Sequence, residues 1–270
     1  LLLQVLARTE ELAEVPGFSR DPVGESGTAN PARGIIHKYR GRALLIVSSG
    51  CAINCRYCFR RHFPYSANQN SRAEWREALA YIAGDAGISE VILSGGDPLL
   101  ASDDYLAELV SRIAAIPHVR RLRIHTRLPV VIPDRVSNGL LDAVARSGLQ
   151  TVVVIHCNHA NEIDDQVEKA LARLAQRGIT LLNQSVLLAG VNDSTEALSA
   201  LSERLFAAGV LPYYLHLLDK VQGAAHFDVP EERARQLIAG VSAALPGYLV
   251  PKLVREVAGE PAKVGVGGAW

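Results

Sequence analysis

Short apolar stretches alternate with longer amphipathic ones from residue 43 to residue 257, and this alternation constrains the fold more than any other feature of the chain. The short stretches are rich in valine, isoleucine and leucine, which is typical of buried β-strands. The longer stretches repeat apolar residues at helical spacing. We predict strands at 43–49, 90–96, 121–127, 151–157, 179–185, 212–218 and 252–257. We predict helices at 71–84, near 102–115, and at 134–146, 163–177, 194–208 and 230–244.

The repeated strand–helix order indicates a parallel sheet with helices packed outside it. An open doubly wound sheet and a barrel-like closure both fit this order. Polar residues or glycine end nearly every strand, which favours the barrel, because barrels carry their chemistry at the ends of many strands. We therefore expect an α/β fold, a partial TIM-type (β/α)6 barrel, at residues 43–257. An N-terminal extension at 1–42 and a C-terminal segment at 258–270 would flank it.

Composition argues against several classes of protein. The 28 lysines and arginines balance the 28 aspartates and glutamates, so no overall charge favours nucleic acid or an anionic membrane as a partner. The apolar runs are too short to span a membrane, and the first 15 residues lack the cleavage site of a signal peptide. Four cysteines, three of them clustered, do not resemble a disulfide framework, so we expect a cytoplasmic protein. The chain has no methionine, so we expect the extension at 1–42 to be truncated.

The cysteine cluster is the strongest chemical signal. Cys51, Cys55 and Cys58 lie in the segment "GCAINCRYCFRRHFPY", residues 50–65, directly after the first predicted strand. Thiolates bind soft metals, and the number of ligands separates one kind of metal site from another. Three clustered thiols therefore suggest a metal centre with an unusual ligand count.

Three kinds of site fit these thiols. A structural zinc ion would need a fourth ligand, from His62 or Cys157. A redox pair of Cys55 and Cys58 would leave Cys51 without a role. A [4Fe–4S] cluster held by three cysteines would leave one iron open to bind another molecule.

The CxxxCxxC spacing after the first strand resembles the radical SAM superfamily. In that superfamily the open iron binds S-adenosylmethionine (SAM), and an electron from the cluster cleaves SAM to a 5′-deoxyadenosyl radical. "SGGDP" at 94–98, "HTRLPVV" at 125–131 and "HCNHANEI" at 156–163 resemble the strand ends that contact SAM. The SAM-binding residues that this resemblance implies are Ser94, Gly95, Gly96, Asp97, His125, His156 and Asn158.

Longer matches narrow the resemblance. "HKYRGRALLIV" at 37–47, "LNQSVLLAGVND" at 182–193, "PYYLHLLDKVQGAAHF" at 212–227 and "REVAGEPAK" at 255–263 resemble the lysine 2,3-aminomutase family. They are most similar to its bacterial branch that makes β-lysine for modification of translation elongation factor P. The resemblance implies an isomerase that converts L-α-lysine to β-lysine by 1,2-amino migration. It also implies pyridoxal 5′-phosphate (PLP) as a cofactor beside SAM and the [4Fe–4S] cluster.

The same resemblance implies the PLP site. Lys263 matches the catalytic lysine that bonds PLP, and its amine must lose a proton to act as a nucleophile. Lys38 and Arg42 match positions that bind the PLP phosphate. Gln184 matches a polar contact at a strand end.

Substrate residues are implied in the same way. Arg60 matches the residue that binds the α-carboxylate of lysine, for which a guanidinium is well suited. Asp219 and Glu256 match the two carboxylates that bind the ε-ammonium. Glu256 stands where the lysine-fermenting enzymes carry aspartate, so recognition of the ε-ammonium could be looser or shifted.

The implied partners are L-lysine, an electron donor such as flavodoxin or ferredoxin, and, functionally, elongation factor P with its lysyl-transferring ligase. Neither nucleic acid nor a membrane is expected. Three rival functions fit the sequence. The first is an aminomutase of the same mechanism acting on another amino acid, such as glutamate or arginine. The second is an Fe–S protein that only transfers electrons or holds a partner, and the third is a zinc-binding structural module. Asp219 and Glu256 argue against glutamate, because both would repel its side-chain carboxylate.

Overall fold

The computed structural model describes residues 1–68 and 75–267, and within them the strands form one sheet in chain order, from β1 to β9. Strands β2 to β8 run parallel, while β1 and β9 pair antiparallel to β2 and β8 at the two edges. The strands are β1 (Ile35–Tyr39), β2 (Arg42–Ser48), β3 (Glu90–Gly95), β4 (Arg121–Thr126), β5 (Gln150–Ile155), β6 (Thr180–Val186), β7 (Leu211–His216), β8 (Lys252–Arg255) and β9 (Val264–Gly265).

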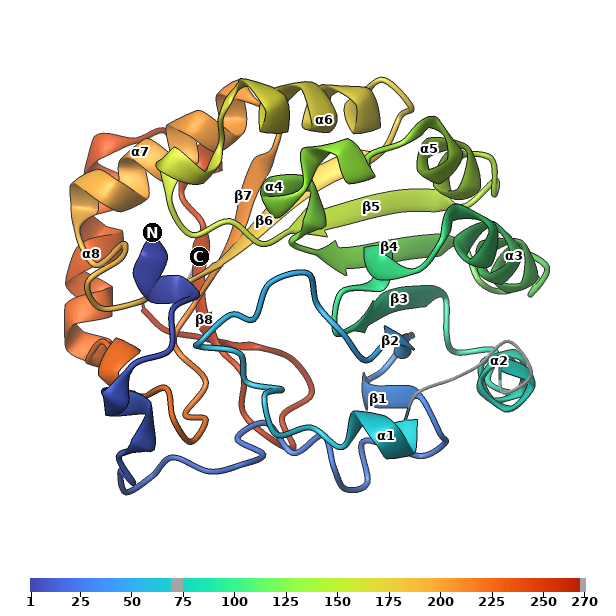
Figure 1. Ribbon diagram of the computed structural model, residues 1–270, viewed down its shortest axis with the longest axis horizontal. Helices are drawn as coiled ribbons and strands as arrows, with labels where there is room; N and C mark the ends of the chain where they lie inside the picture. Colours follow the sequence, from blue (N-terminus) through green and yellow to red (C-terminus); the bar gives the residue numbers. More distant parts are fainter. Residues whose placement is uncertain (69–74, 268–270) are drawn as a thin grey trace.

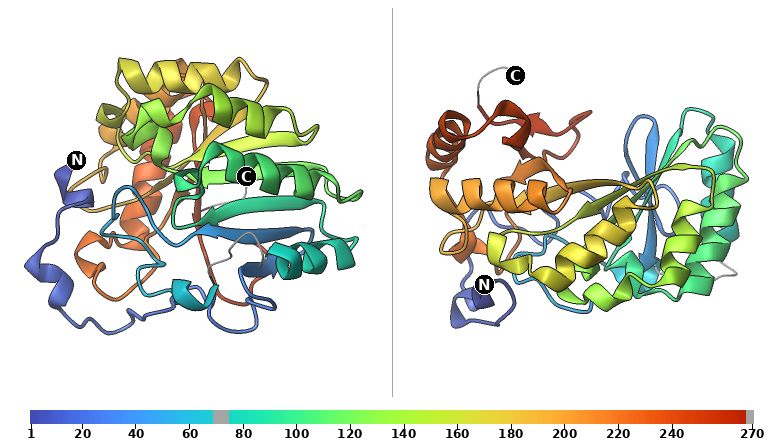
Figure 2. Two further views of the ribbon diagram at one scale, coloured as in Figure 1. Left: turned by 45° about the vertical axis from the view of Figure 1, so that its right-hand side comes forward. Right: turned by 90° about the horizontal axis from the view of Figure 1, so that it is seen from above.

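The sheet is curved but not closed, and its helices lie on the outer side (Figure 1; two further views in Figure 2). This arrangement confirms the predicted α/β fold with a partial barrel. The α-helices are α1 (Tyr65–Asn68), α2 (Trp75–Gly84), α3 (Asp103–Ala114), α4 (Leu128–Val131), α5 (Asn138–Ala145), α6 (Asp165–Ala175), α7 (Thr195–Ala207) and α8 (Glu231–Ala244). Short 3-10 turns are η1 (Leu2–Gln4), η2 (Thr9–Leu12), η3 (Pro98–Leu100), η4 (Pro133–Arg135), η5 (Ala160–Glu162), η6 (Ala225–Phe227) and η7 (Gly247–Leu249).

Serine side chains set the start of several helices. The hydroxyls of Ser102, Ser137 and Ser194 accept hydrogen bonds from backbone N–H groups in the first turns of α3, α5 and α7. Because Ser137 is such a cap, the helix predicted at 134–146 begins four residues late, at Asn138. The first turn of the helix predicted at 71–84 lies outside the described residues.

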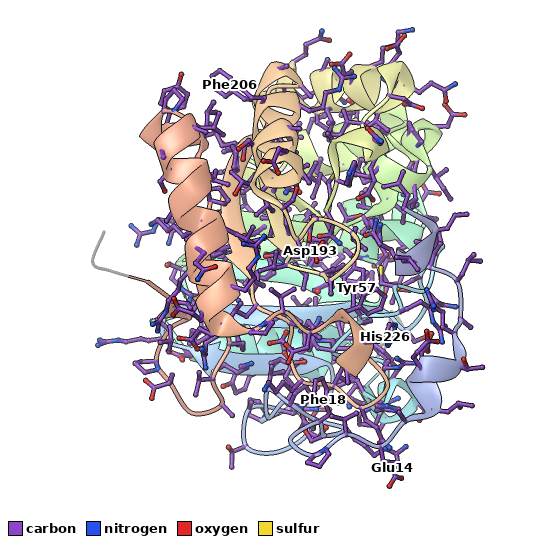
Figure 3. The ribbon with its side chains drawn as sticks, turned by 90° about the vertical axis from the view of Figure 1, so that its left-hand side faces the viewer. Glu14, Phe18, Tyr57, Asp193, Phe206 and His226 are labelled. Carbon is purple, nitrogen blue, oxygen red and sulfur yellow. The ribbon has the colours of Figure 1, made fainter. Side chains whose placement is uncertain are left out.

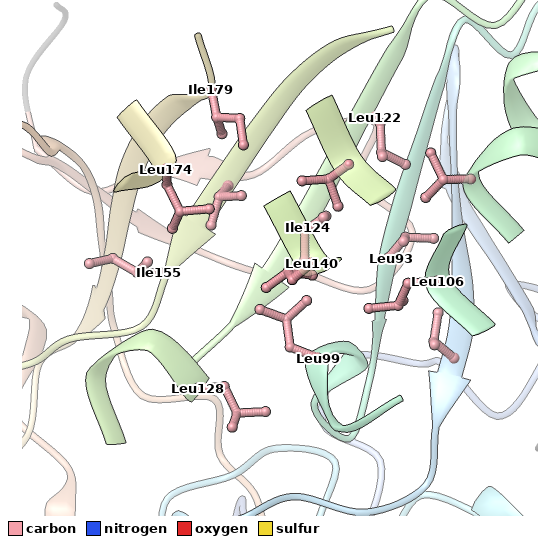
Figure 4. Packing of buried hydrophobic residues seen from close by; sticks show 14 of the residues in the cluster. Leu93, Leu99, Leu106, Leu122, Ile124, Leu128, Leu140, Ile155, Leu174 and Ile179 are labelled. Atoms are coloured by element: carbon pink, nitrogen blue, oxygen red, sulfur yellow. The ribbon is translucent and has the colours of Figure 1, made fainter. Parts of the chain in front are cut away.

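One large apolar core lies between the sheet and the helices. Leu93 of β3 and Ile124 of β4 pack with Leu106 of α3 and Leu140 of α5, and each is almost fully buried (Figure 4). Full burial of one such side chain contributes about 1.5–3 kcal/mol to folding. The apolar faces of the strands and helices therefore pack into one core, and this core holds the ends of the strands in place.

The two edge strands were not predicted, and both lie outside residues 43–257. Each is short, so its apolar periodicity is weak; β9 has only the pair Val264–Gly265. Hydrogen bonds to the neighbouring strands β2 and β8 hold β1 and β9 in extended form, although the sequence of each gives no clear strand pattern. These edges carry Lys38, within β1, and Lys263, directly before β9.

The N-terminal segment crosses the open side of the sheet. Ser19 donates its backbone N–H to Lys220 at 2.9 Å and accepts from Gln222 at 2.8 Å, which joins the segment to the loop after β7. Figure 3 shows this face, with Phe18 and His226 labelled on the two neighbouring segments. In residues 1–68 and 75–267, no helix combines the length and the apolar character that crossing a membrane requires.

Candidate active site

A cavity of about 480 Å³ opens at the carboxyl ends of the parallel strands. Its walls come from these strand ends, the cysteine loop at 49–64, the N-terminal segment and the C-terminal residues. Every site residue predicted from the sequence lines it. They are Lys38, Arg42, Cys51, Cys55, Cys58, Arg60, Ser94, Gly95, Gly96, Asp97, His125, His156, Asn158, Gln184, Asp219, Glu256 and Lys263.

The cysteine loop presents three free thiols to this cavity. Cys51 is exposed, and Cys55 and Cys58 are half-buried. Burial and the neighbouring thiols raise the pKa of Cys51 to about 12 and raise that of Cys58 as well, so an added metal would have to displace protons there. Three thiol donors in one loop suit an iron–sulfur cluster chemically. Within the described residues, no three His, Cys, Asp or Glu side chains converge on one point that could hold a single metal ion.

The two alternative partners for the thiols do not line the cavity. Cys157 is buried in the main core, where its Sγ lies 3.4 Å from the carbonyl oxygen of His159. His62 Nε2 lies 3.3 Å from the carbonyl oxygen of Gln222. The structure thus gives no support to either residue as a fourth zinc ligand.

Gly95, the last residue of β3, and Gly96 directly after it allow the cysteine loop to approach the sheet. A Cβ on Gly96 would lie 2.1 Å from the carbonyl oxygen of Gly50, and Gly95 has a φ of +122°. The backbone N–H of Gly96 donates to Ser48 at 2.7 Å, and that of Asp97 donates to Gly50 at 2.7 Å. This close approach joins the end of β3 to the start of the cysteine loop.

Two predicted SAM residues are already engaged within the protein. Asp97 accepts from the hydroxyl of Thr126 and from the backbone N–H of Arg127, both at 2.7 Å. Asn158 donates to the Tyr57 hydroxyl at 2.7 Å and to Gln4 Oε1 at 2.8 Å. Both side chains therefore hold neighbouring strand ends and loops in place.

Three neutral histidines line the cavity. Burial lowers the pKa of His156 to about 3 and that of His125 and His216 well below the usual value. His156 Nε2 lies 3.0 Å from Gln184 Nε2. The Nε2 atoms of His125 and His216 are buried without a hydrogen-bond partner in the described part of the chain. Buried polar atoms normally have partners, so these two nitrogens are available to a bound molecule.

Glu256 joins the two lysines of the cavity. Its Oε2 lies 2.7 Å from Lys263 Nζ, and its Oε1 lies 2.6 Å from Lys38 Nζ. The Tyr39 hydroxyl also donates to Oε1. Burial opposes ionisation, but the two lysine charges outweigh it and lower the pKa of Glu256 to about 2. Both oxygens of this carboxylate therefore have cationic partners.

The line of alternating charges continues to Arg60. Lys38 Nζ lies 3.8 Å from Glu25 Oε1. Both oxygens of Glu25 accept from the buried guanidinium of Arg60, which also donates to Ser94 Oγ at 3.1 Å. Buried charges of this kind are stable only when paired, and here each has an opposite neighbour.

Asp219 differs from the other acids of the cavity. No hydrogen bond or ion pair joins its carboxylate to another described side chain, although it lies within reach of the Lys263 charge. Burial raises its pKa to about 7. It is the acidic group that can accept a new ammonium without losing a partner.

The sequence analysis did not select Glu25, His216 or Gln4. Gln4 is 1% exposed and binds the side chains of Arg127, Asn158 and Glu162. Glu25 and Gln4 precede the predicted barrel, where no periodic pattern marked them. His216 lies in the segment "PYYLHLLDKVQGAAHF", at the carboxyl end of a predicted strand, and this position could have marked it as a cavity residue.

Comparison of the sequence with known proteins identifies its family. The family model of the Radical SAM superfamily matches residues 45–201. The chain is 54% identical to the L-lysine 2,3-aminomutase of Escherichia coli strain K12, over 97% of this chain and 76% of that protein. It is 53% identical to the L-lysine 2,3-aminomutase of Haemophilus influenzae, over 97% of this chain and 78% of that protein.

A solved structure supports the fold. The crystal structure of a radical SAM methyltransferase from Sphaerobacter thermophilus is similar with a TM-score of 0.56, at 18% identity, over 82% of this chain and 68% of that chain. At this identity the likeness concerns the fold alone. The family match and the two aminomutases carry the assignment further. The chain belongs to the radical SAM superfamily and, within it, to the L-lysine 2,3-aminomutase family of isomerases, and this membership implies a [4Fe–4S] cluster, SAM and PLP as cofactors.

Proposed function

We propose that this protein converts L-lysine to β-lysine by moving the α-amino group to the β-carbon, with PLP, SAM and a [4Fe–4S] cluster in one site. The observation that carries the proposal is the lining of one cavity by three thiols, the Lys263 amine and charged groups of both signs. Lysine has one carboxylate and two amines, so it requires both kinds of charge. When bound, the cluster and SAM supply a carbon-centred radical, and PLP supplies the π-system across which nitrogen migrates.

The cofactors are assigned to separate walls of the cavity. Cys51, Cys55 and Cys58 hold the cluster. SAM binds at the carboxyl ends of β3, β4 and β5 and in the turns directly after β3 and β5. Its contacts there are Ser94, Gly95, Gly96, Asp97, His125, His156 and Asn158. Lys263, in the C-terminal segment at 258–270, bonds PLP, while Lys38, Arg42 and Gln184 hold the rest of that cofactor. The guanidinium of Arg42 lies 4.5 Å from the centre of the Tyr39 ring, which supports a cation held at this wall.

Substrate binding uses Arg60, at one end of the line of alternating charges, and Asp219, which stands outside that line. Arg60 binds the α-carboxylate, and Asp219 binds the ε-ammonium because its carboxylate has no other partner. Glu256 contributes to the same ammonium site. Its Oε2 lies 2.7 Å from Lys263 Nζ and would be shared between that amine and the ε-ammonium.

The physiological setting follows from the resemblance to the β-lysine-forming branch. The product serves the modification of elongation factor P by its lysyl-transferring ligase. The electron for the cluster comes from a small donor such as flavodoxin or ferredoxin, and the reaction takes place in the cytoplasm. Loss of the encoding gene would then leave elongation factor P without β-lysyl modification, which mass spectrometry of the purified factor would measure.

The direct test is an anaerobic assay. Protein reconstituted with iron and sulfide is incubated with SAM, PLP, dithionite and isotopically labelled L-lysine, and the amino acids are separated and identified by mass spectrometry. We expect labelled β-lysine, with SAM required but not consumed in proportion to product. Rearrangement of arginine or glutamate in place of lysine would refute the substrate. SAM cleavage without any rearrangement would refute the aminomutase activity.

A further inference from the structure

We propose that Arg127 sets the reduction potential of the cluster by donating a charged hydrogen bond to the sulfur of Cys55. Arg127 Nη1 lies 2.8 Å from Cys55 Sγ. The inference depends on the cluster and on Cys55 as one of its ligands, but not on lysine as the substrate. It assigns to Arg127 a positioning and tuning role rather than a contact with the reacting atoms.

The guanidinium is held by three elements of the chain. Nη1 also donates to the Tyr57 hydroxyl at 3.0 Å. Nη2 donates to Gln4 Oε1 at 3.0 Å and to Glu162 Oε2 at 2.7 Å. The backbone N–H of Arg127 donates to Asp97 Oδ2 at 2.7 Å. The partners of the guanidinium come from the cysteine loop, η1 and η5, so the side chain cannot turn away without breaking contacts in each. The backbone contact with Asp97 holds the main chain at the start of this side chain.

Burial makes the charge of Arg127 effective. Its side chain is 8% exposed, and so is that of its ionic partner Glu162. Charges in such a position are screened far less than charges at the surface. A charge placed against the Cys55 sulfur therefore acts strongly on any electron added there.

The sign of the effect follows from the charge balance. Reduction adds one electron, taken from a one-electron donor, and no bond forms or breaks at the cysteines. Hydrogen bonds to cluster sulfurs and nearby positive charge favour the more negative, reduced form and so raise the reduction potential. Arg127 therefore raises the potential, and the carboxylate of Glu162, which neutralises part of that charge, lowers it.

The contact singles out one of the three thiols. In the described part of the chain, Arg127 is the cationic side chain with a hydrogen bond to a thiol of the cysteine loop. Arg60, two residues after Cys58, is engaged by Glu25 and Ser94 instead. Cys55 is thus the thiol to which Arg127 brings a charged hydrogen bond.

The test measures the potential rather than turnover. Reconstituted wild type, Arg127→Met and Glu162→Gln are titrated with dithionite under EPR, without SAM or lysine, and iron is counted per chain. We expect Arg127→Met to reduce the ratio of reduced to oxidised cluster about tenfold at a fixed potential, a shift of about 59 mV for one electron. We expect Glu162→Gln to shift the ratio the opposite way. Arg123→Met is the matched control, since Arg123 lines the same cavity from β4 but pairs with Glu90 at 2.7 Å; its ratio should stay within about twofold of wild type by the same relation.

Several results would overturn the inference. Unchanged potentials in both variants would show that the charge pair does not act on the cluster. Shifts in the same direction would indicate a purely structural role. If Arg127→Met loses its iron, Arg127→Lys, which keeps the charge, and Glu162→Gln decide the question: a potential equal to wild type in Glu162→Gln refutes the proposal. Because lysine is absent, failure here is distinct from failure to form β-lysine.

Discussion

The carboxylate of Glu25 accepts two hydrogen bonds from the guanidinium of Arg60, at 2.6 Å from Nε and 2.9 Å from Nη2. Glu25 belongs to the N-terminal segment, and Arg60 follows the cysteines, so the pair joins two distant parts of the chain. Glu25 is 4% exposed and Arg60 is 9% exposed. The residue proposed to bind the substrate carboxylate therefore already has a carboxylate on one edge.

Replacing Glu25 should strengthen the binding of lysine. Glu25→Gln keeps the shape of the side chain but removes a negative charge from the proposed carboxylate site, and like charges at such a site are repulsive. We expect the Kd for lysine, measured by calorimetry on PLP-loaded protein without SAM, to fall by about tenfold, or about 1.4 kcal/mol.

A ligand without a carboxylate provides the control for Glu25. The affinity of 1,5-diaminopentane should change little in the same variant, because it does not approach Arg60. Weaker lysine binding with unchanged diamine binding would contradict the repulsion and would mean that Glu25 orients Arg60 instead.

Asp219 should make lysine use dependent on pH near neutrality. Burial raises its pKa to about 7, and the charges that face it belong to Lys263, Glu256, Lys38 and Glu25. The ε-ammonium requires the ionised carboxylate, so kcat/KM for lysine should rise as pH increases through about 7 and level off above it. The check is a pH profile of kcat/KM at constant ionic strength.

Asp219→Asn should remove this acidic limb. It should also lower kcat/KM by at least about 30-fold, since loss of one partner of a buried charge pair costs about 2 kcal/mol or more. If Asp219→Asn keeps both the rise of kcat/KM with pH and the wild-type value of kcat/KM, Asp219 is excluded from the ammonium site.

Lys263→Ala should separate the two cofactor sites. Loss of the amine should abolish the visible absorbance of bonded PLP, while the iron content and the colour of the cluster remain, because the thiols lie on a different loop. Lys252→Ala, at an exposed position of β8, is the control and should retain both signals. Loss of iron together with PLP absorbance in Lys263→Ala would indicate that the lysine supports the fold.

Gly96→Ala should disturb the cysteine loop. The new Cβ would lie 2.1 Å from the carbonyl oxygen of Gly50, so that backbone must move. Overpacking of this kind costs about 1–3 kcal/mol, and we expect a lower Tm and less iron bound per chain. Gly84→Ala is the control, because within residues 1–68 and 75–267 no atom outside its own turn of helix lies within 4 Å of its Cβ position. Equal Tm and iron content in the two variants would contradict the proposed close approach.

Most of the fold was predictable because it depends on local patterns. Continuous apolar runs predicted strands β2 to β8, and helical periodicity predicted α2, α3 and α5 to α8 to within a few residues, apart from the late start of α5. The four-residue helices α1 and α4 were not predicted. Parallel connections then bring all the strand ends to one edge. Candidate residues chosen at those ends, such as His125, Gln184 and Asp219, accordingly line one cavity.

The partners of those residues were not predictable from the same patterns. Glu25 pairs with Arg60, and Gln4 and Glu162 hold Arg127, across separations that no periodicity encodes. The hydrogen bonds that Asp97 and Asn158 make within the protein were not predictable either, although both residues line the cavity as expected.

The sequence by itself determined the order of strands β2 to β8 and of the predicted helices between them, the cysteine spacing, and the short motifs from which the candidate site residues were chosen. These features depend on side-chain periodicity and on neighbours within a few residues. The tertiary structure decided which charge faces which. A buried charge must find an opposite partner, and which partner lies within hydrogen-bond distance depends on how segments far apart in the chain pack together.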